Sequence, residues 1–493
     1  MPIRMEKDEQ RPNQPNNPQP NTPSGGGGLL KLLPFLLLFL VKRPKLIIPV
    51  VIIGGIWWFF FGGSQMFSPV ASTTENQGDP TEFSLGFEPN EPEYDKRLVY
   101  ASLAESKNTM PSKVSLLQYA PPRLNQGRQG SCVGWASAYA ARTILHTRQT
   151  GQAPNQAAFS PSYVYNQIAF DGCQGTYLHY AMETMLEKGA LPFSEFEYNE
   201  GSCRLKPSNT EIQQARQFKI KGYERLSVGA NNYKVDVNAI RQNIAAGAPV
   251  VIGMMVGESF TYGMKGRQVW QPSRSDLTGS SKLGGHAMCV IGYDDTALSG
   301  KGAFQIMNSW GNDWGDNGIA WVDYGNFEYF VKEAYGLYPM GQIATTTTND
   351  SKLAVEFGLL DNATQNNIPL TKFSDNIFRT KSPIKKGDKF KVEVTNSIEC
   401  YTYVFGMETD GSSYVLFPYT EKHSAYCGVT GTRIFPNDYS MVADDLGSTD
   451  WIAVVVSKKP LNFKALNAAI SQSSKDTYPG KVMAALGSEL AAK

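Results

Sequence analysis

Residues 125–136 read Asn-Gln-Gly-Arg-Gln-Gly-Ser-Cys-Val-Gly-Trp-Ala. Cys132 follows a glycine-rich loop and precedes a run with helical character, residues 133–147. A thiol at the N-terminus of a helix feels the positive end of the helix dipole, which stabilises the thiolate. Most free cysteines are small buried apolar residues, but a glycine-rich loop that feeds a helix is a poor place for one. We therefore predict that Cys132 is a nucleophile.

Two downstream motifs supply an imidazole and a carboxamide. His286 precedes an apolar run, residues 287–293, which predicts a buried strand with the imidazole at its start. Asn308 ends a second such run, residues 304–308, which we expect to pair with the first. The amide oxygen of Asn308 would then accept a hydrogen bond from the ring and set its tautomer, and Trp310 would shield that bond from water. A thiol, an imidazole and a carboxamide are the parts of a nucleophilic Cys-His-Asn site.

The N-terminal region predicts a membrane anchor. Residues 1–45 form a tail rich in Pro, Asn and Gln, which predicts disorder, and residues 46–63 carry no charged side chain. As a helix that stretch would be about 27 Å long, close to the thickness of the hydrocarbon layer. A cleaved signal peptide and a buried core helix are alternative interpretations. Against them, the apolar region begins late, no clear small-residue cleavage site follows it, and no amphipathic period is visible.

Charge asymmetry predicts the orientation of this anchor. Lys42, Arg43 and Lys45 lie just before the expected span, whereas no basic residue occurs between Ser64 and Asp95. Because basic residues are enriched on the cytoplasmic side, we expect a single-pass membrane protein with a cytoplasmic N-terminus. The rest of the chain would then be periplasmic or extracellular.

Composition divides the remainder of the chain into three parts. Residues 64–107 are acidic and rich in Pro, Gly, Ser and Thr, which predicts a solvated linker. A globular domain follows over residues 108–343, and a threonine-rich boundary separates it from residues 351–493. The last part combines alternating strand patterns with an Asp-Gly turn at residues 410–411 and helical patterns near its end, so we expect a mainly β domain with terminal helices.

The overall composition excludes one class of partner. Lys and Arg number 46 against 45 Asp and Glu, with no basic stripe or run of aromatic residues. We therefore expect no nucleic-acid partner. We also expect no metal ion and no other cofactor.

The motifs around the nucleophile resemble those of papain-like (C1 family) cysteine peptidases. Residues 130–132 are similar to the nucleophile loop of that family, residues 285–287 to the segment with its base, and residues 308–318 to its asparagine motif. Gln126 stands where the family keeps the glutamine of its oxyanion hole. Residues 172–176 resemble the segment that lines the non-primed subsites.

This resemblance covers about residues 110–340 and implies an α+β fold of two lobes, one helical and one β-barrel-like, with a cleft between them. It implies thiol-dependent hydrolysis of peptide bonds, as in an endopeptidase. Cys132 would attack the carbonyl carbon, while the Gln126 side chain and the Cys132 backbone amide hold the oxyanion. His286 would protonate the leaving amine, and water would release the acyl group. The expected substrate-binding positions are Gly175, Thr176, Gly285 and Trp310.

Several departures from the family pattern limit what the resemblance implies. Gln129 stands where the family often has a cysteine, and Val133 where it has an aromatic residue. Thr176 replaces a glycine common at that subsite, so the side-chain preference stays open. Residues 64–107 do not resemble the family's inhibitory pro-domain, which argues against activation by removal of a pro-segment.

The loss of the usual cysteine affects the expected disulfides. With its family partner missing, Cys173 would pair with Cys203 instead, and Cys400 would pair with Cys427. Cys289 would stay buried and reduced. Two such bridges would suit an oxidising compartment.

Residues 351–493 resemble a small β-rich domain of unknown function found at the ends of exported bacterial proteins, which implies a spacer or a module for a protein partner. The bacterial origin itself rests on this family likeness. The first functional hypothesis is a membrane-anchored thiol peptidase that acts on proteins or peptides. Two alternatives stay open: a catalytically silent papain-fold scaffold that binds a peptide, and an amidase or transpeptidase that acts on cell-wall peptides.

Overall fold

The computed structural model describes residues 3–8, 83–338, 352–437, 439–443 and 449–487. Among these residues, no helix is long and apolar enough to cross a membrane. The predicted span over residues 46–63 lies outside the described residues, so it stays a prediction.

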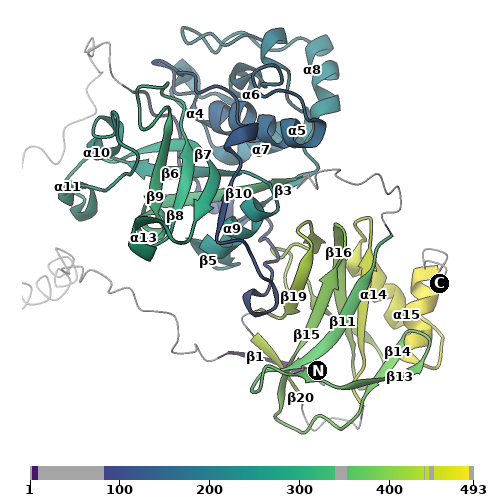
Figure 1. Ribbon diagram of the computed structural model, residues 1–493. Helices are drawn as coiled ribbons and strands as arrows, with labels where there is room; N and C mark the ends of the chain where they lie inside the picture. Colours follow the sequence, from purple (N-terminus) through teal and green to yellow (C-terminus); the bar gives the residue numbers. More distant parts are fainter. Residues whose placement is uncertain (1–2, 9–82, 339–351, 438, 444–448, 488–493) are drawn as a thin grey trace, which may run out of the picture. The chain divides into compact units, whose positions relative to one another are not determined.

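A seven-stranded antiparallel sheet forms one half of the region between residues 113 and 338 (Figure 1). Its strands run in the order β3-β10-β6-β7-β8-β9, with β2 paired to β7. The bounds are Lys113–Ser115 (β2), Gly222–Arg225 (β3), Val250–Val256 (β6), Gly284–Asp294 (β7), Ala303–Met307 (β8), Ile319–Asp323 (β9) and Val331–Tyr338 (β10). The central strands β6 and β7 are buried along most of their length, which explains their nearly unbroken apolar sequence. The predicted strands over residues 287–293 and 304–308 are confirmed as β7 and β8.

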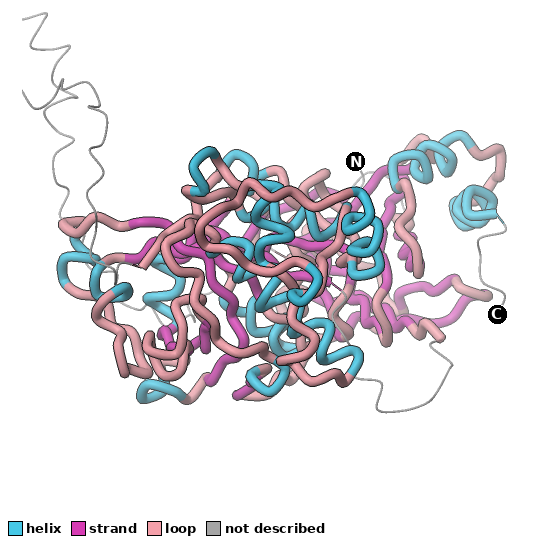
Figure 2. Tube along the Cα trace, turned by 90° about the horizontal axis from the view of Figure 1, so that it is seen from above, coloured by secondary structure: helices cyan, strands magenta, loops and turns pink. Residues whose placement is uncertain are grey.

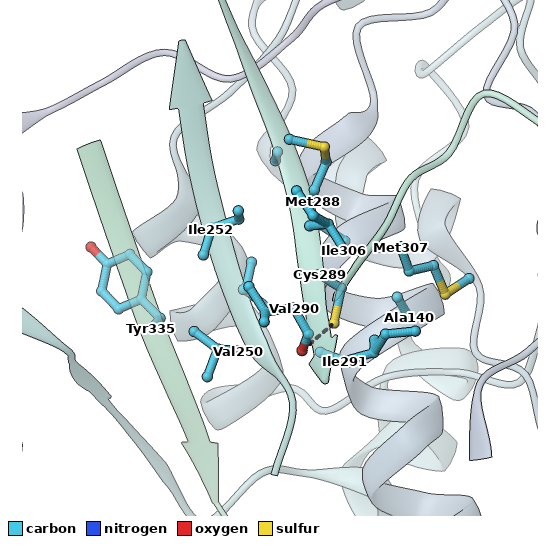
Figure 3. Packing of buried hydrophobic residues seen from close by; sticks show 14 of the residues in the cluster. Ala140, Val250, Ile252, Met288, Cys289, Val290, Ile291, Ile306, Met307 and Tyr335 are labelled. Carbon is cyan, nitrogen blue, oxygen red and sulfur yellow. Dashed lines mark hydrogen bonds between the residues drawn. The ribbon is translucent and has the colours of Figure 1, made fainter. Parts of the chain in front are cut away.

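The core of this sheet surrounds Cys289. Figure 3 shows apolar side chains from β6, β7 and β8 around it, together with Ala140 from a neighbouring helix. Cys289 is a fully buried free thiol, as predicted. It fills space in the core as a small apolar residue.

The other half of the region is helical (Figure 2, cyan). A buried helix begins at Cys132 and comprises α4 (Cys132–Gly134), the π-helical stretch η5 (Trp135–Arg142) and α5 (Thr143–Thr150). It ends at Gly151, whose φ of 72° lies in the left-handed region that glycine tolerates. Helices α6 (Pro161–Ile168) and α7 (Leu178–Glu187) pack against it. The helix predicted over residues 133–147 and the α+β class are confirmed.

The described residues of the C-terminal domain form two larger antiparallel sheets, a two-stranded antiparallel sheet of β13 and β14, and two helices. One sheet has the order β1-β20-β15-β11-β12 with β19 on β15, and the other has the order β17-β16-β18 with β21 on β16. The bounds are Val355–Asp361 (β11), Asn367–Ile368 (β12), Leu370–Ser374 (β13), Ile377–Thr380 (β14), Lys389–Asn396 (β15), Cys400–Met407 (β16), Ser413–Phe417 (β17), Tyr426–Cys427 (β18), Gly431–Phe435 (β19), Tyr439–Ala443 (β20), Ile452–Ser457 (β21), Phe463–Gln472 (α14) and Tyr478–Leu486 (α15). The predicted turn at residues 410–411 joins β16 to β17. The mainly β character and the terminal helices are therefore confirmed for the described residues.

Two segments that composition predicts to be solvated are ordered instead. Residues 83–107 include helix α3 (Glu91–Asp95) and bury Tyr94 and Tyr100, so the prediction of a solvated linker is wrong there. Residues 3–7 form strand β1, so the prediction of disorder is wrong for that end of the tail. In both segments a few apolar side chains among charged neighbours supply the buried contacts. Residues 9–82 lie outside the described part.

Candidate active site

Cys132 is the first residue of the buried helix, and Ser131 is its N-cap. The glycine-rich loop therefore delivers the thiol to a helix N-terminus, as predicted. The side chain of Cys132 is fully buried, and the backbone amide of Ala287 donates a hydrogen bond of 3.4 Å to its sulfur. Because Ala287 follows His286 on β7, the sheet brings the candidate base beside the candidate nucleophile.

His286 and Asn308 meet because β7 and β8 are neighbours. Met307, the last residue of β8, pairs with Cys289 of β7, and Asn308 follows it. His286 Nε2 lies 2.7 Å from Asn308 Oδ1, and the amide of Ser309 donates to the same oxygen at 2.7 Å. An amide oxygen only accepts, so Nε2 carries the ring proton and Nδ1 keeps its lone pair. The predicted hydrogen bond between imidazole and carboxamide is confirmed.

Trp310 covers this hydrogen bond, as predicted. Its ring stacks on the imidazole of His286 with the centroids 4.1 Å apart and an angle of 22° between the planes. Both side chains are buried, so the bond is shielded from water. In such an environment a hydrogen bond is stronger and its geometry more rigid than in water.

Gln126 is tied to the same motif. Its side-chain oxygen accepts a hydrogen bond of 2.6 Å from Ser309 Oγ. This bond orients the amide group so that Nε2 points away from Ser309. That nitrogen donates to the backbone oxygens of Gln129 at 2.9 Å and of Ser84 at 3.1 Å. The donor expected to hold an oxyanion is therefore already bonded to a carbonyl group of a segment that precedes the domain.

This segment, residues 83–88, is called the cleft segment below. Its backbone amides at Gly86 and Phe87 both donate to Gly285 O, at 3.2 and 3.1 Å. On its other side, Thr176 N donates to Gly86 O at 2.9 Å and Glu88 N donates to Thr176 O at 3.2 Å. Residues 83–88 thus form backbone hydrogen bonds with both halves of the domain at the site.

The side chains of the cleft segment fit the same surface. Phe83 stacks on Trp310 with ring centroids 4.8 Å apart. A Cβ atom added to Gly253 would lie 2.2 Å from the ring of Phe87, and one added to Gly285 would lie 1.9 Å from the backbone oxygen of Phe87. Because Gly253 and Gly285 have no side chain, the cleft segment can occupy this space.

All four expected substrate-binding positions contact or closely approach this segment. Thr176 and Gly285 bind its backbone, Trp310 Nε1 donates to Ser84 O at 3.3 Å, and a Cβ atom on Gly175 would lie 2.7 Å from Gly86 O. The interpretation of residues 64–107 by composition missed the segment. A usable signal was the alternation of Phe83, Leu85 and Phe87 within an otherwise acidic stretch, because one in two residues of a bound strand faces the surface.

Burial under this segment sets the protonation of the site. Burial raises the pKa of the Cys132 thiol to about 12, although the backbone amides of Ala287, Val133 and Gly86 act in the opposite direction. Burial also lowers the pKa of His286 to about 4, against the hydrogen bond to Asn308. Both groups are therefore neutral at pH 7. The thiolate that the helix dipole alone predicts is absent from this closed state, because desolvation outweighs the dipole.

The pH dependence of alkylation should report this protonation. A thiol reacts as its thiolate, and below its pKa the thiolate fraction rises about tenfold per pH unit. We expect the rate of iodoacetamide labelling at Cys132 in the intact chain to keep rising up to about pH 10 without a plateau, since the pKa is about 12. Peptide-resolved mass spectrometry at a series of pH values measures this rate. A plateau near neutral pH would instead indicate an existing thiolate–imidazolium pair.

The expected disulfides are half correct. Cys173 and Cys203 form a bridge that closes a loop with a sequence separation of 30 residues, as predicted. Cys400 and Cys427 are free buried thiols, so the second predicted bridge is not present. They nevertheless face each other across β16 and β18 as register partners. The register of β16 and β18 therefore places Cys400 opposite Cys427, but the two thiols do not form a disulfide.

Loss of the Cys173–Cys203 bridge should destabilise the helical half of the domain. For a loop of this length, the entropy model gives a stabilisation of about 3 to 4 kcal/mol. We expect the free energy of unfolding of the Cys173→Ser/Cys203→Ser chain to be lower by that amount. Urea unfolding followed by circular dichroism measures this difference. The Cys400→Ser/Cys427→Ser chain, which removes two thiols but no bond, is the matched control. An equal loss in both chains would contradict the prediction.

Two parts of the chain match known protein families. Residues 116–337 match the family described as papain family cysteine protease. These residues form a papain-family peptidase domain. Residues 384–460 match a second family, a domain of unknown function (DUF4384), which agrees with the expected C-terminal module. Both family resemblances are therefore confirmed; the anchor and the bacterial type stay predictions.

Similar proteins align with the papain-family domain. An uncharacterized peptidase C1-like protein of Acanthamoeba polyphaga mimivirus is 27% identical over 42% of this chain and 65% of its own length. Cathepsin K of Mus musculus is 27% identical over 41% of this chain and 56% of its own. The chain thus spans between about half and two thirds of these relatives. Among solved structures, xylellain, a cysteine protease from Xylella fastidiosa, matches with a TM-score of 0.43 and 23% identity over 54% of this chain and 98% of its own.

The described residues hold no group of three or more His, Cys, Asp or Glu side chains arranged for a metal ion. The other three histidines, His146, His179 and His423, contact aromatic rings.

Proposed function

We propose that the papain-family domain hydrolyses peptide bonds with the thiol of Cys132 as its nucleophile. The observation that carries this proposal is the bond between His286 Nε2 and Asn308 Oδ1. It leaves the Nδ1 lone pair of His286 as the free basic site of the ring, on the residue next to the amide that touches the Cys132 sulfur. A base in this tautomer can take the proton of the thiol and later give it to a leaving amine.

Each of the four candidate residues would have a role in the reaction. The Cys132 thiolate attacks the carbonyl carbon of the substrate, and Gln126 Nε2 donates to the oxyanion that forms there. His286 protonates the leaving amine, and water activated by the same imidazole then releases the acyl group. Asn308 holds the imidazole in one tautomer and orientation throughout.

The described state would be a latent form of this enzyme. Ser84 O already accepts from Gln126 Nε2, and Gly86 fills the space over the nucleophile loop. A substrate would have to displace these groups to reach the sulfur. Displacement would return water to the site, which lowers the pKa of the thiol and raises that of the imidazole.

The substrate and the place of action are part of the same proposal. Proteins or peptides are the proposed substrates, and residues 46–63 would attach the domain to a membrane, as a single crossing only where residues 3–8 are not paired with the C-terminal domain. The C-terminal domain would serve a partner rather than the chemistry, since the candidate catalytic side chains all lie between residues 126 and 308.

Activity-based labelling tests the proposal. The reduced full-length chain is incubated with a peptidyl epoxide and with denatured casein, beside Cys132→Ala and His286→Ala chains. We expect covalent labelling at Cys132 and casein cleavage, both lost in Cys132→Ala. If neither the intact chain nor a chain with a displaced cleft segment is labelled, the proposal fails.

The occupied cleft also favours a second candidate, a papain-fold scaffold that holds a peptide without turnover. In that case the Cys132→Ala chain would retain every cellular effect of the native protein. Product analysis with peptidoglycan fragments tests the remaining alternative, an amidase or transpeptidase for cell-wall peptides.

A further inference from the structure

One edge of a sheet in the C-terminal domain pairs with a strand from a remote part of the chain. Strand β20 (Tyr439–Ala443) pairs with β15 at only two positions. On its other edge, β1 (Ile3–Lys7) pairs with all five of its residues, from Ile3 opposite Ala443 to Lys7 opposite Tyr439. An unpaired strand edge exposes amide and carbonyl groups that can template another strand, so β20 has the properties of an acceptor edge.

One end of the site is an apolar pocket. Ile3 is 1% exposed and belongs to the same buried cluster as Phe390, Met441 and Ala443. Burial of an isoleucine side chain from water favours binding. The N-terminal strand is therefore held by a side chain as well as by its backbone.

The other end is a charged pocket that fits a carboxylate. Asp8 accepts hydrogen bonds from Lys391 Nζ, from Ser440 Oγ and from Asn362 Nδ2. Lys391 is only 6% exposed, and its other partner is the backbone oxygen of Asn437 at 2.7 Å. A buried ammonium group is costly without a counter-charge, and Asp8 supplies that charge.

We propose that the C-terminal domain is a strand-accepting peptide-binding domain and that the chain's own residues 3–8 are its ligand. The site would select an extended peptide with an aliphatic residue five positions before an aspartate. Binding adds one antiparallel strand to the sheet, with the pocket for Ile3 and the pocket for Asp8 setting the register. This inference does not depend on the peptidase activity.

The proposal constrains the topology of the chain. Residues 3–8 and the residues from Phe83 onward belong to one compact unit. Both ends of the segment 9–82 must then lie on the same side of any membrane. A single crossing at residues 46–63 with a cytoplasmic N-terminus would place residues 3–8 and the C-terminal domain on opposite sides, so the two expectations exclude each other.

Peptide binding tests the acceptor site. A fluorescent peptide with the sequence of residues 2–9 is titrated against three full-length chains: the native chain, a displaced-strand chain (Ile3→Asp/Asp8→Ala), and the displaced-strand chain with Lys391→Met. We expect binding to the displaced-strand chain, and at least tenfold weaker binding to the other two. Equal binding to all three, or no binding to the displaced-strand chain, overturns the proposal.

Two controls separate recognition from a loss of folding. Lys389→Met in the displaced-strand chain removes a lysine from the same strand, whose partner Glu6 is 44% exposed, and should change affinity less than threefold. A peptide with Asp8→Asn changes only the ligand and should bind at least tenfold more weakly. If this peptide binds as well as the original, the carboxylate pocket is not used and the proposal fails.

Cysteine labelling tests the topology directly. Arg4→Cys and Glu356→Cys place single exposed thiols on the two parts, and the four native free cysteines are buried. Each chain, in membranes of expressing cells, is treated with a membrane-impermeant maleimide before and after permeabilisation. We expect the two positions to respond alike. Labelling of one before permeabilisation and of the other only afterwards would overturn the proposal.

Discussion

The Gly86→Val chain is expected to cleave peptides at least tenfold faster than the native chain. A Cβ atom at Gly86 would lie 2.0 Å from the backbone oxygen of Gly130, so valine cannot occupy that place while the cleft segment is bound. Four backbone hydrogen bonds hold Gly86, Phe87 and Glu88 in the cleft. At about 0.5 to 1.5 kcal/mol net for each, their loss corresponds to about 2 to 6 kcal/mol, or a shift of one to four powers of ten in the open population.

The rate of epoxide labelling at Cys132 measures this effect most directly, with casein cleavage as the second readout. Gly358→Val is the matched control, because a Cβ atom at Gly358 meets nothing within 4 Å. It should leave the labelling rate unchanged. A Gly86→Val chain that is folded but is labelled no faster than the native one would show that residues 83–88 do not limit access.

Replacement of His286 by alanine in the Gly86→Val chain is expected to lower kcat/KM by about two to four powers of ten. General acid–base catalysis by a positioned imidazole contributes a factor of that size, and the alanine also removes the group that is proposed to accept the thiol proton. The alanine keeps the β7 backbone, so the pairing of residue 286 with Met254 is retained. Steady-state kinetics on a fluorogenic peptide, with a pH profile, measures the change.

His423→Ala in the same Gly86→Val chain is the matched control, since His423 lies in the C-terminal domain and bonds to Thr420. It should leave kcat/KM within a factor of two. A similar loss in both chains would indicate that destabilisation, not the missing base, reduces activity.

Much of the site could be predicted from the sequence because its parts are local. The loop before Cys132, the helix after it and the apolar runs beside His286 and Asn308 each predict their own structure. The pairing of these two strands brings His286 to Asn308. The hydrogen bond of 2.7 Å between them confirms this pairing. The bridge between Cys173 and Cys203 was instead expected from the family resemblance, because the family's usual partner of Cys173 is missing here.

The protonation of the site could not be predicted from the same stretch. The helix N-terminus favours the thiolate of Cys132, and that contribution is visible in the local sequence. Desolvation, which raises its pKa to about 12, depends on the fold that also brings the backbone of Gly86 and Ala287 to the thiol. The pKa therefore depends on contacts between residues that are far apart in the sequence, and these contacts exist only in the folded chain.

The sequence by itself determined the candidate nucleophile, its candidate base, the residue bonded to that base, and the alternation of strands and turns in the C-terminal domain. These features depend on side-chain chemistry and on periodicity within short stretches. Only the tertiary structure decided that residues 83–88 lie in the cleft and that residues 3–8 complete a sheet. In both cases the partners are backbone groups of remote strands and loops, and a backbone amide or carbonyl group has no signature in the amino-acid sequence.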